Sequence, residues 1–410
     1  MTNLDSMPMA SADAARRRSY WQLNPQIDYF NHGSFGATPT AVLTAQRTLQ
    51  DAMERDPIAF LAPERDLEPK LDEVRRIIAN FVGANPSDLA FVRNATDGVN
   101  AVLRSFPFSE GDEVVATNHG YNACNNAARF AAQWRGAKMR IADVPFPLHS
   151  GEDVIAAIEQ TVTARTRLLL VDHVTSSTGL VFPIKAIIDA AHARSIRVLV
   201  DGAHAAGMVP LDLNQLGADY YTANHHKWLC APKSSGFLWV RSELQGEVRP
   251  SIISHAANRS RPSRSKFLAE FDWQGTYDPT PLLSVPASLA FLNSLYPGGV
   301  DQLLTTNQKL AIDARALLLS ALDMDAPAPA EMIGSLVTLP LRGAESQIDG
   351  AAEDPLQTVL RERYRIELPI FAGLKPGSRL LRIALQAYND LGQVQRLGDA
   401  LRRELLQSAA

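Results

Sequence analysis

The chain has 410 residues, of which 46% are hydrophobic and 20% charged, and its formal net charge at pH 7 is −4. A chain of this length exceeds the usual size of one domain, so two packed domains with sizeable cores are expected. The slightly acidic balance gives no electrostatic reason to expect nucleic acid as a partner. The two cysteines, Cys124 and Cys230, are too few for a disulfide framework and lack the C-x-x-C spacing of a zinc site, so we expect a reducing compartment and no metal.

The N-terminal region has no strand pattern of its own. Three arginines, Arg16 to Arg18, are not followed by an apolar core of signal-peptide length, and no apolar run approaches the roughly 20 residues that cross a bilayer. We therefore predict a cytoplasmic protein without a membrane span. Residues 1–56 form a segment that we expect to pack near the second domain and the functional site.

Between residues 88 and 240, short apolar runs alternate with helical stretches. The segments 154–161 and 183–193 space their apolar residues three and four apart, as amphipathic helices do. The strand-like runs span 88–92, 112–118, 137–144, 167–174, 196–201, 220–224 and 236–240. This alternation predicts an α/β domain over residues 57–290, with a mostly parallel seven-stranded sheet covered by helices on both faces. The carboxyl ends of such strands line the ligand crevice.

The pattern changes after about residue 286. A long helical stretch is followed by a segment rich in proline and alanine at 325–329, then by strand-like runs and a terminal helix. We therefore predict a smaller α+β domain over residues 291–410.

Two residues near strand ends are candidates for chemistry. Lys227 follows the run 220–224 among residues that do not resemble a solvated helix face, although most lysines only hold an ammonium in water. Asp201 ends a very apolar strand, where a partly desolvated carboxylate needs a cation or several donors to stay ionised. A protonated pyridine nitrogen would meet this need, and a helix cap is an equally good interpretation of Asp201.

Two more polar segments follow strands. Residues 94–100 are predicted to open a helix, and backbone N–H groups with a hydroxyl at a helix N-terminus form a site for a phosphate group. Residues 172–179 are rich in hydroxyl groups that could bond a phenolic or carboxylate oxygen. Each segment alone is also explained by an ordinary cap or turn. Together with the lysine and the aspartate, they place four functional groups at one edge of one sheet.

Several ordered motifs together resemble the class V aminotransferase family of fold-type I pyridoxal-phosphate enzymes, and within it the isopenicillin N epimerase-like branch. The motifs are Asn-His-Gly-Ser-Phe-Gly (31–36), Asn-Ala-Thr (94–96), Val-Asp-Gly-Ala-His (200–204), His-His-Lys (225–227), Gly-Thr-Tyr-Asp (275–278) and Leu-Arg-Ile-Ala-Leu-Gln-Ala-Tyr-Asn (381–389). They extend over nearly the whole chain. The resemblance implies a fold-type I transferase architecture and pyridoxal 5′-phosphate as the cofactor.

The resemblance also implies roles for residues around the cofactor. Lys227 would carry it as a Schiff base, Asp201 would pair with its ring nitrogen, and His204 would lie beside the ring. Ser176 stands near the position that bonds the phenolic oxygen, where related enzymes commonly have asparagine. Thr276 resembles a position that reaches the phosphate of a neighbouring subunit, which implies a homodimer. The groups implied to bind the phosphate are Ala95, Thr96, Asn224 and His226.

On the substrate side, Arg382 matches the arginine that binds the α-carboxylate of the substrate, a role that suits a bidentate guanidinium. Either Tyr121 or His119 would stack on the cofactor, and we favour Tyr121. The histidine of the N-terminal motif is explained equally well as a packing residue. The residues of this motif implied to close over the substrate are Asn31, His32 and Ser34.

We expect an enzyme that acts at the α-carbon of a small amino-acid substrate. Epimerisation is the reaction that we favour. It would need Tyr121 or His119 to relay a proton to the face of the α-carbon opposite the lysine. A carbon–sulfur lyase is the alternative, followed by a transaminase, and a binding protein without turnover is a third class. A desulfurase would need a cysteine on a mobile loop, whereas Cys124 and Cys230 lie in or beside predicted core elements. The basic run 255–266 is expected to be a solvated loop near the dimer contact.

Overall fold

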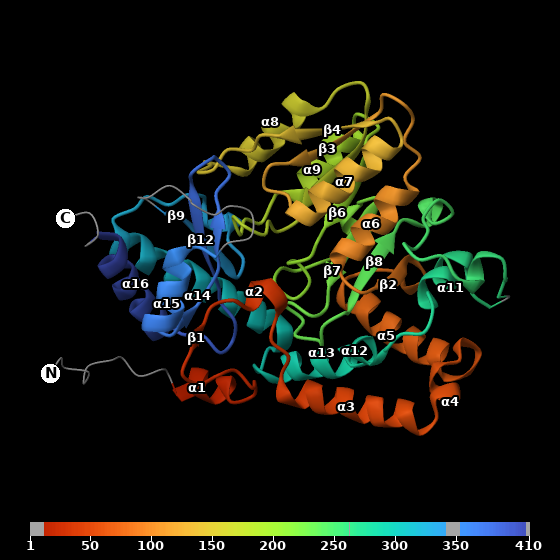
Figure 1. Ribbon diagram of the computed structural model, residues 1–410, viewed down its shortest axis with the longest axis horizontal. Coiled ribbons are helices and arrows are strands. Elements are labelled where there is room, and N and C mark those ends of the chain that lie inside the picture. Colours follow the sequence, from red (N-terminus) through yellow and green to blue (C-terminus); the bar gives the residue numbers. More distant parts are fainter. Residues whose placement is uncertain (1–11, 262, 342–352, 407–410) are drawn as a thin grey trace.

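The computed structural model describes residues 12–261, 263–341 and 353–406, and its largest feature is a seven-stranded sheet (Figure 1). The strand order is β2-β8-β7-β6-β5-β3-β4, and β8 alone runs antiparallel to its neighbours. The strands are β2 (Leu89–Val92), β3 (Glu113–Thr117), β4 (Lys138–Ala142), β5 (Thr166–Asp172), β6 (Arg197–Asp201), β7 (Tyr220–Asn224) and β8 (Gly236–Val240). The predicted α/β class and its mostly parallel sheet are confirmed.

The sheet is apolar on both faces because helices cover both. Leu168 and Leu170 of β5 belong to one hydrophobic cluster, and Leu169 and Val171 belong to the other, as side chains that alternate along a strand must. The first cluster contains α6 (Ala95–Ser105) and α7 (Asn122–Trp134); the second contains α5 (Glu68–Phe81), α8 (Gly151–Thr161) and α9 (Ile184–His192). Continuous apolar runs in the sequence follow from this double burial.

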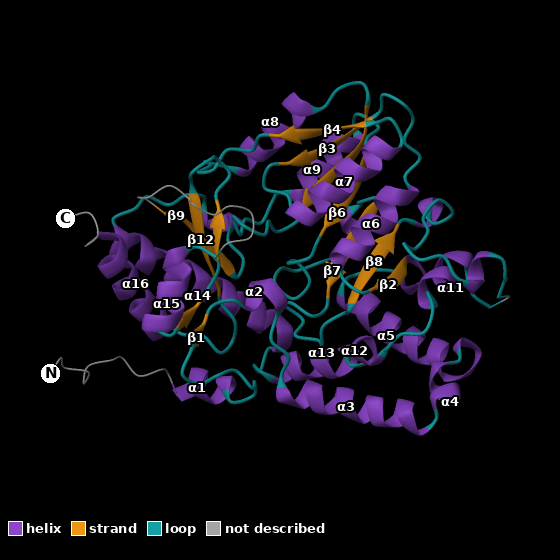
Figure 2. Cartoon of the chain, in the orientation of Figure 1, coloured by secondary structure: helices purple, strands orange, loops and turns teal. Residues whose placement is uncertain are grey.

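A second part of the molecule is built on a three-stranded antiparallel sheet (Figure 2). Its order is β11-β12-β9, and α14 packs against both β9 and α16. The elements are α14 (Gly299–Leu322), β9 (Leu336–Leu341), α15 (Pro355–Arg363), β10 (Ile366–Glu367), β11 (Ile370–Ala372), β12 (Arg379–Ala384) and α16 (Leu391–Leu406). The predicted α+β content of the C-terminal region is confirmed, while the boundaries at 56/57 and 290/291 remain predictions.

The N-terminal segment joins this second part of the molecule. Strand β1 (Asp28–Tyr29) pairs in parallel with β10, and Asn31 forms a bridge with Ala384 just beyond. The chain then returns to the large sheet through α2 (His32–Phe35), α3 (Thr40–Arg55) and α4 (Pro57–Leu61). Residues 1–11 lie outside the described residues.

Most described residues of the basic run 255–266 are exposed, as expected of a solvated loop, whereas Arg264 is held against the protein. Arg264 has a side chain only 6% exposed, and it forms ion pairs with Asp272 (2.7 Å) and Asp72 (2.8 Å). Asp272 ends α11 (Lys266–Asp272) and also binds the buried Arg75 of α5 at 2.6 Å. These arginines therefore hold the loop against α5 rather than offering free positive charge to a ligand.

The remaining helices are short connections or lie beneath the large sheet in the view of Figure 1. They are α1 (Ala12–Arg18), α10 (Leu213–Leu216), α12 (Thr280–Leu283) and α13 (Val285–Ser294). No helix among the described residues combines the length and apolarity needed to cross a membrane.

Candidate active site

Lys227 lies just beyond β7, and its amine faces a histidine. The Lys227 Nζ atom is 3.1 Å from His204 Nε2, in the turn that follows β6. Burial lowers the pKa of Lys227 to about 8, and the positive charge of Arg382 acts in the same direction. A lysine with such a pKa is partly an uncharged amine near neutral pH, as a nucleophile or base must be.

Asp201 ends β6 with its side chain buried, 2% exposed. Its Oδ1 accepts a hydrogen bond from the Ala203 amide (3.0 Å), and its Oδ2 accepts one from the Cys124 thiol (3.1 Å). Asp172 is its register partner on β5 and is also buried. Burial raises the pKa of both carboxyl groups, and the charge of Asp201 raises that of Asp172 further.

No basic side chain forms an ion pair with Asp201 among the described residues, although a buried carboxylate is normally matched by a cation. A protonated pyridine nitrogen is such a cation, and the reactive lysine stands nearby. The donor set at this strand edge therefore fits pyridoxal phosphate.

The phosphate site implied by the motifs lies where α6 begins. Asn94 caps the helix by accepting a hydrogen bond from the Asp97 amide (2.9 Å), and Thr96 lies in the first turn. The Ala95 amide, however, donates to the Asn224 side chain at 2.8 Å. Asn224 thus ties the helix start to the end of β7, and the Ala95 donor is already used.

The start of α6 comes close to β7 because residue 98 is glycine. A Cβ atom on Gly98 would lie 2.2 Å from Thr222 Oγ1, far inside van der Waals contact. Beyond β7, His226 Nδ1 hydrogen-bonds to the Ser235 carbonyl at 3.0 Å. Asn224, His226 and the first turn of α6 therefore gather at the same strand edge as Lys227.

Arg382 is a buried guanidinium without a carboxylate partner among the described residues. It lies on β12, is 1% exposed and stacks over Phe371, with its Cζ 4.9 Å from the ring centroid. Its Nη1 donates to the Ser176 carbonyl (2.7 Å), its Nη2 to the Ser34 hydroxyl (3.2 Å), and its Nε has no partner. Burial lowers the pKa of Arg382 to about 10. A desolvated cation with spare donors is suited to a carboxylate ligand.

The N-terminal motif supports this site from one side. Ser34 donates to Asn31 Oδ1, and Asn31 Nδ2 donates to Glu367 at 3.1 Å. His32 is fully buried; its Nε2 lies 3.0 Å from the Lys227 carbonyl and its Nδ1 lies 2.9 Å from the Tyr388 hydroxyl. Since both ring nitrogens have protein partners, His32 supports the lysine backbone, which agrees with the packing interpretation rather than with substrate contact.

The two stacking candidates differ in burial. His119 is 1% exposed, and its ring nitrogens lie 2.8 Å from Thr178 Oγ1 and 3.2 Å from the Val144 carbonyl. Tyr121 is 46% exposed and precedes α7. Burial raises the pKa of Tyr121, the neighbouring Cys124 and the charge of Asp201 raise it further, and the charge of Arg382 opposes them. Tyr121 is thus the candidate whose phenol shares the crevice with Asp201 and Arg382.

Thr276 lies apart from these residues. It is exposed, and it lines a cavity of about 430 Å³ together with Arg93, Lys233 and Ser234. No hydrogen bond within the described part of the chain joins it to the residues around Lys227. Its implied role toward a neighbouring subunit remains a prediction.

The sequence did not predict three residues that the structure brings to the site. Cys124 donates a hydrogen bond to Asp201, and the ring of Phe371 packs against the Arg382 guanidinium. The indole N–H of Trp228 donates to His204 Nδ1 at 3.2 Å. Trp228 directly follows the lysine, and Cys124 lies one helical turn after Tyr121, so both could have been considered. Nothing in the sequence points to Phe371. Both cysteines are buried, as expected.

Comparison with known proteins identifies the relatives of this chain. The sequence matches the aminotransferase class-V family over residues 39–397. An isopenicillin N epimerase of Amycolatopsis lactamdurans is 32% identical over 408 residues, which cover 96% of this chain and 99% of that protein. A probable chloroplastic L-cysteine desulfhydrase of Arabidopsis thaliana is 31% identical over 402 residues, which cover 92% of this chain and 83% of that protein.

Solved structures show the same fold at lower identity. A variant of C-DES, with glycine covalently linked to its PLP cofactor, has a TM-score of 0.79 at 21% identity and matches 94% of this chain and 98% of that one. The cysteine desulfurase CsdA of Escherichia coli has a TM-score of 0.75 at 20% identity, with 96% and 98% matched. The resemblance inferred from the motifs is confirmed, and this chain belongs to the class-V aminotransferase family.

Proposed function

We propose that this chain is a pyridoxal-phosphate enzyme that binds an amino-acid substrate through its α-carboxylate and changes the bonding at its α-carbon. One observation carries the proposal: the buried guanidinium of Arg382, which has no carboxylate partner among the described residues, lies near enough to the amine of Lys227 to lower its pKa. Membership of the class-V aminotransferase family supports the cofactor.

The residues that would hold the cofactor surround the ends of β6 and β7. Lys227 would bond it covalently, Asp201 would pair with its ring nitrogen, and the start of α6 with His226 would face its phosphate. Tyr121 would cover the ring. When bound, pyridoxal phosphate withdraws electrons from the α-carbon and so makes its proton acidic.

The chain's own residues supply the remaining steps. Arg382 orients the substrate by its carboxylate, and Ser34 and Ser176 hold the guanidinium in place. Once its amine is free, Lys227 takes the α-proton, because burial keeps its pKa low enough for an uncharged form. Asp201 stays ionised with the help of the Cys124 and Ala203 donors.

The proposed reaction is an epimerisation, with Tyr121 returning a proton to the face opposite Lys227. Its raised pKa keeps the phenol protonated and thus able to donate. An isopenicillin N epimerase among the relatives supports this reaction. A carbon–sulfur lyase is the second candidate, because three relatives from plants carry the name L-cysteine desulfhydrase at 29 to 31% identity over most of this chain. That reaction needs only Lys227 as base and a leaving group on the β-carbon.

Two measurements test the proposal in sequence. Borohydride reduction of the cofactor-loaded protein, followed by peptide mapping, should place the label on Lys227; a label on another lysine contradicts the proposal. Amino acids are then offered in deuterated water. Exchange of the α-proton without keto-acid product supports epimerisation, pyruvate from cysteine supports the lyase, and a keto acid with a transferred amino group supports a transaminase. No exchange with any amine would indicate a binding protein.

We also propose a homodimer, in which Thr276 reaches the neighbouring active site. Its exposure on the rim of a cavity leaves it accessible to a second copy of the chain.

A further inference from the structure

The two ring nitrogens of His204 face two different partners. His204 Nδ1 lies 3.2 Å from the Trp228 Nε1 atom, and His204 Nε2 lies 3.1 Å from Lys227 Nζ. The histidine is 2% exposed and the tryptophan 0% exposed, so water does not compete for the contact between these two rings. Because both nitrogens make close contacts, the orientation of the imidazole ring is defined.

The chemistry of these groups allows one arrangement of protons. An indole N–H can only donate, so His204 Nδ1 must accept and carries no proton. Burial holds the pKa of His204 well below its usual range, so the ring is neutral and has a single proton. That proton is therefore on Nε2, where it points at the lysine.

This arrangement decides the state of the lysine. A proton on His204 Nε2 needs an acceptor, and the Lys227 nitrogen can accept only as an uncharged amine, because an ammonium has no lone pair. A Lys227 ammonium would instead bring its N–H groups against the N–H of His204. The contact at 3.1 Å therefore favours the neutral lysine.

We infer that Trp228 is a positioning residue that fixes the tautomer of His204 and thereby shifts the protonation equilibrium of Lys227 toward the free amine. This inference rests on the proposed function, in which that amine reacts. Trp228 directly follows Lys227 in the chain. One short segment therefore supplies both the reactive amine and the N–H donor that fixes the tautomer of its histidine neighbour.

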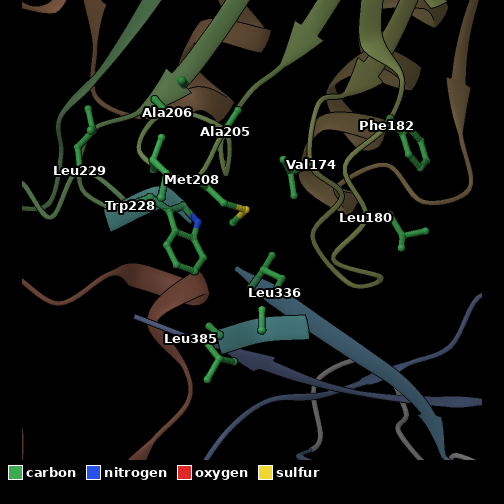
Figure 3. Close-up of a cluster of buried hydrophobic side chains, with 14 of the residues drawn as sticks. Val174, Leu180, Phe182, Ala205, Ala206, Met208, Trp228, Leu229, Leu336 and Leu385 are labelled. Carbon is green, nitrogen blue, oxygen red and sulfur yellow. The ribbon is translucent and has the colours of Figure 1, made fainter. Parts of the chain in front are cut away.

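Packing keeps the indole in place. Trp228 lies in a hydrophobic cluster with Met208, Leu336 and Leu385, which approach it from the large sheet side and from the second part of the molecule (Figure 3). The His32 ring also packs against it, with ring centroids 5.2 Å apart. A side chain held on several sides cannot turn its N–H away, so the tautomer of His204 does not depend on a mobile group.

The first test measures the tautomer of His204 in the unaltered protein, and a variant is needed only to assign the signal. Nitrogen-15 NMR of histidine-labelled protein, with His204 assigned by its loss in His204→Gln, reports which ring nitrogen carries the proton. We expect a protonated Nε2 and an unprotonated Nδ1 throughout the pH range in which the protein is folded. A proton on Nδ1, or a mixture of both tautomers, would overturn the inference.

The second test measures the consequence for Lys227. Only the uncharged amine condenses with the aldehyde of pyridoxal phosphate, releasing water, so the pH at which cofactor uptake is half-maximal reports the pKa of this lysine. Trp228→Phe removes the N–H and lets the proton move to Nδ1, which makes Nε2 an acceptor for an ammonium. We expect the midpoint to rise by about one pH unit, the equivalent of one hydrogen bond.

Two controls make the result specific. Trp239 is a second buried tryptophan, 4% exposed, and its indole N–H has no partner among the described residues. Trp239→Phe should leave the midpoint unchanged, and an equal shift in both variants would contradict the role of Trp228. In a His204→Gln background Trp228→Phe should add no shift, because the effect passes through the imidazole; a full additional shift would exclude that route.

The proposed function and this inference fail separately. A borohydride label on a different lysine would contradict the proposed function. The NMR result is obtained on the protein without cofactor and tests only the tautomer of His204. A label on Lys227, combined with an unchanged pH midpoint of cofactor uptake in Trp228→Phe, would contradict the inference about Trp228 and leave the proposed function intact.

Discussion

At the scale of single residues, the candidate site is a set of buried charges that only partly neutralise one another. The charges of Asp201 and Asp172 act on the nearby Lys227, yet no ion pair joins Lys227 or Arg382 to either carboxyl group among the described residues. Burial of an unpaired charge costs free energy, so such a set persists where ligands complete it. The anionic substrate and the cationic ring nitrogen are the groups that would do so.

Replacing Arg382 tests the substrate side of this balance. Arg382→Ala should weaken the binding of substrates with an α-carboxylate by about 2–5 kcal/mol, because the carboxylate would be left desolvated without a partner. Arg382→Lys should recover only part of this loss, since an ammonium cannot form the bidentate contact. Michaelis constants measure both effects. Arg379→Ala, on the same strand but paired with Asp354, should leave them unchanged; equal affinity in Arg382→Ala removes this residue from the site.

The pKa of Lys227 predicts a pH dependence. Burial lowers this pKa from 10.5 to about 8, so the amine is charged below pH 8 and uncharged above it. Because only the uncharged form accepts the α-proton, kcat should rise as the pH increases through about 8. Turnover at saturating substrate over neutral to alkaline pH tests this sign. A flat profile, or one that falls with rising pH over this range, would contradict the role of Lys227 as the base.

At the scale of elements, the approach of α6 to β7 positions the implied phosphate site. Gly98→Ala would place a Cβ atom 2.2 Å from Thr222 Oγ1, so the helix must move away from the strand. We expect cofactor affinity to fall by about 1–3 kcal/mol, the usual cost of overpacking. Equilibrium titration with pyridoxal phosphate measures it. Gly246→Ala is a matched control, because nothing lies within 4 Å of its added Cβ. A comparable loss of cofactor affinity in both variants would contradict a role of the α6 position in cofactor binding.

The elements themselves were largely predictable. All seven strands of the large sheet follow from apolar runs bounded by polar turns, and α8 and α9 follow from their helical spacing. These patterns are local, and burial on both faces makes them pronounced. The antiparallel direction of β8 and the pairing of β1 with β10 were not predicted, because strand direction and long-range pairing leave no signature in one segment.

Site residues divide in the same way. Lys227, Asp201 and Arg382 could be identified because each stands in a recognisable motif, and the structure brings them together. The contacts of Cys124, Trp228 and Phe371 were missed because each depends on which side chain meets another across the fold. The run 255–266 is mostly exposed, as expected, but the ion pairs of Arg264 were not predicted, since its acidic partners come from two separate helices.

At the scale of the whole molecule, the exposed Thr276 tests whether active sites are shared between subunits. Thr276→Glu would repel a phosphate, and Lys227→Ala removes the reactive amine, so each protein alone should be inactive. If Thr276 serves its neighbour, a mixed dimer of the two variants should regain activity, because one of its sites combines an intact lysine with an intact threonine. Activity assays after co-refolding measure this, and analytical ultracentrifugation gives the oligomeric state. A mixed dimer without activity would contradict the proposal that Thr276 contributes to the active site of the neighbouring subunit.

The pairing of β1 with β10 has a consequence for how the protein is made. Ser34, near the beginning of the chain, contacts Arg382, near its end, and Asn31 bridges to Ala384. A ribosome must therefore synthesise the chain as far as β12 before the substrate-binding side of the crevice can close. The site that would receive the vitamin-derived coenzyme is thus complete only once these strands exist, and fragments that lack them would leave the early segment without its counterpart.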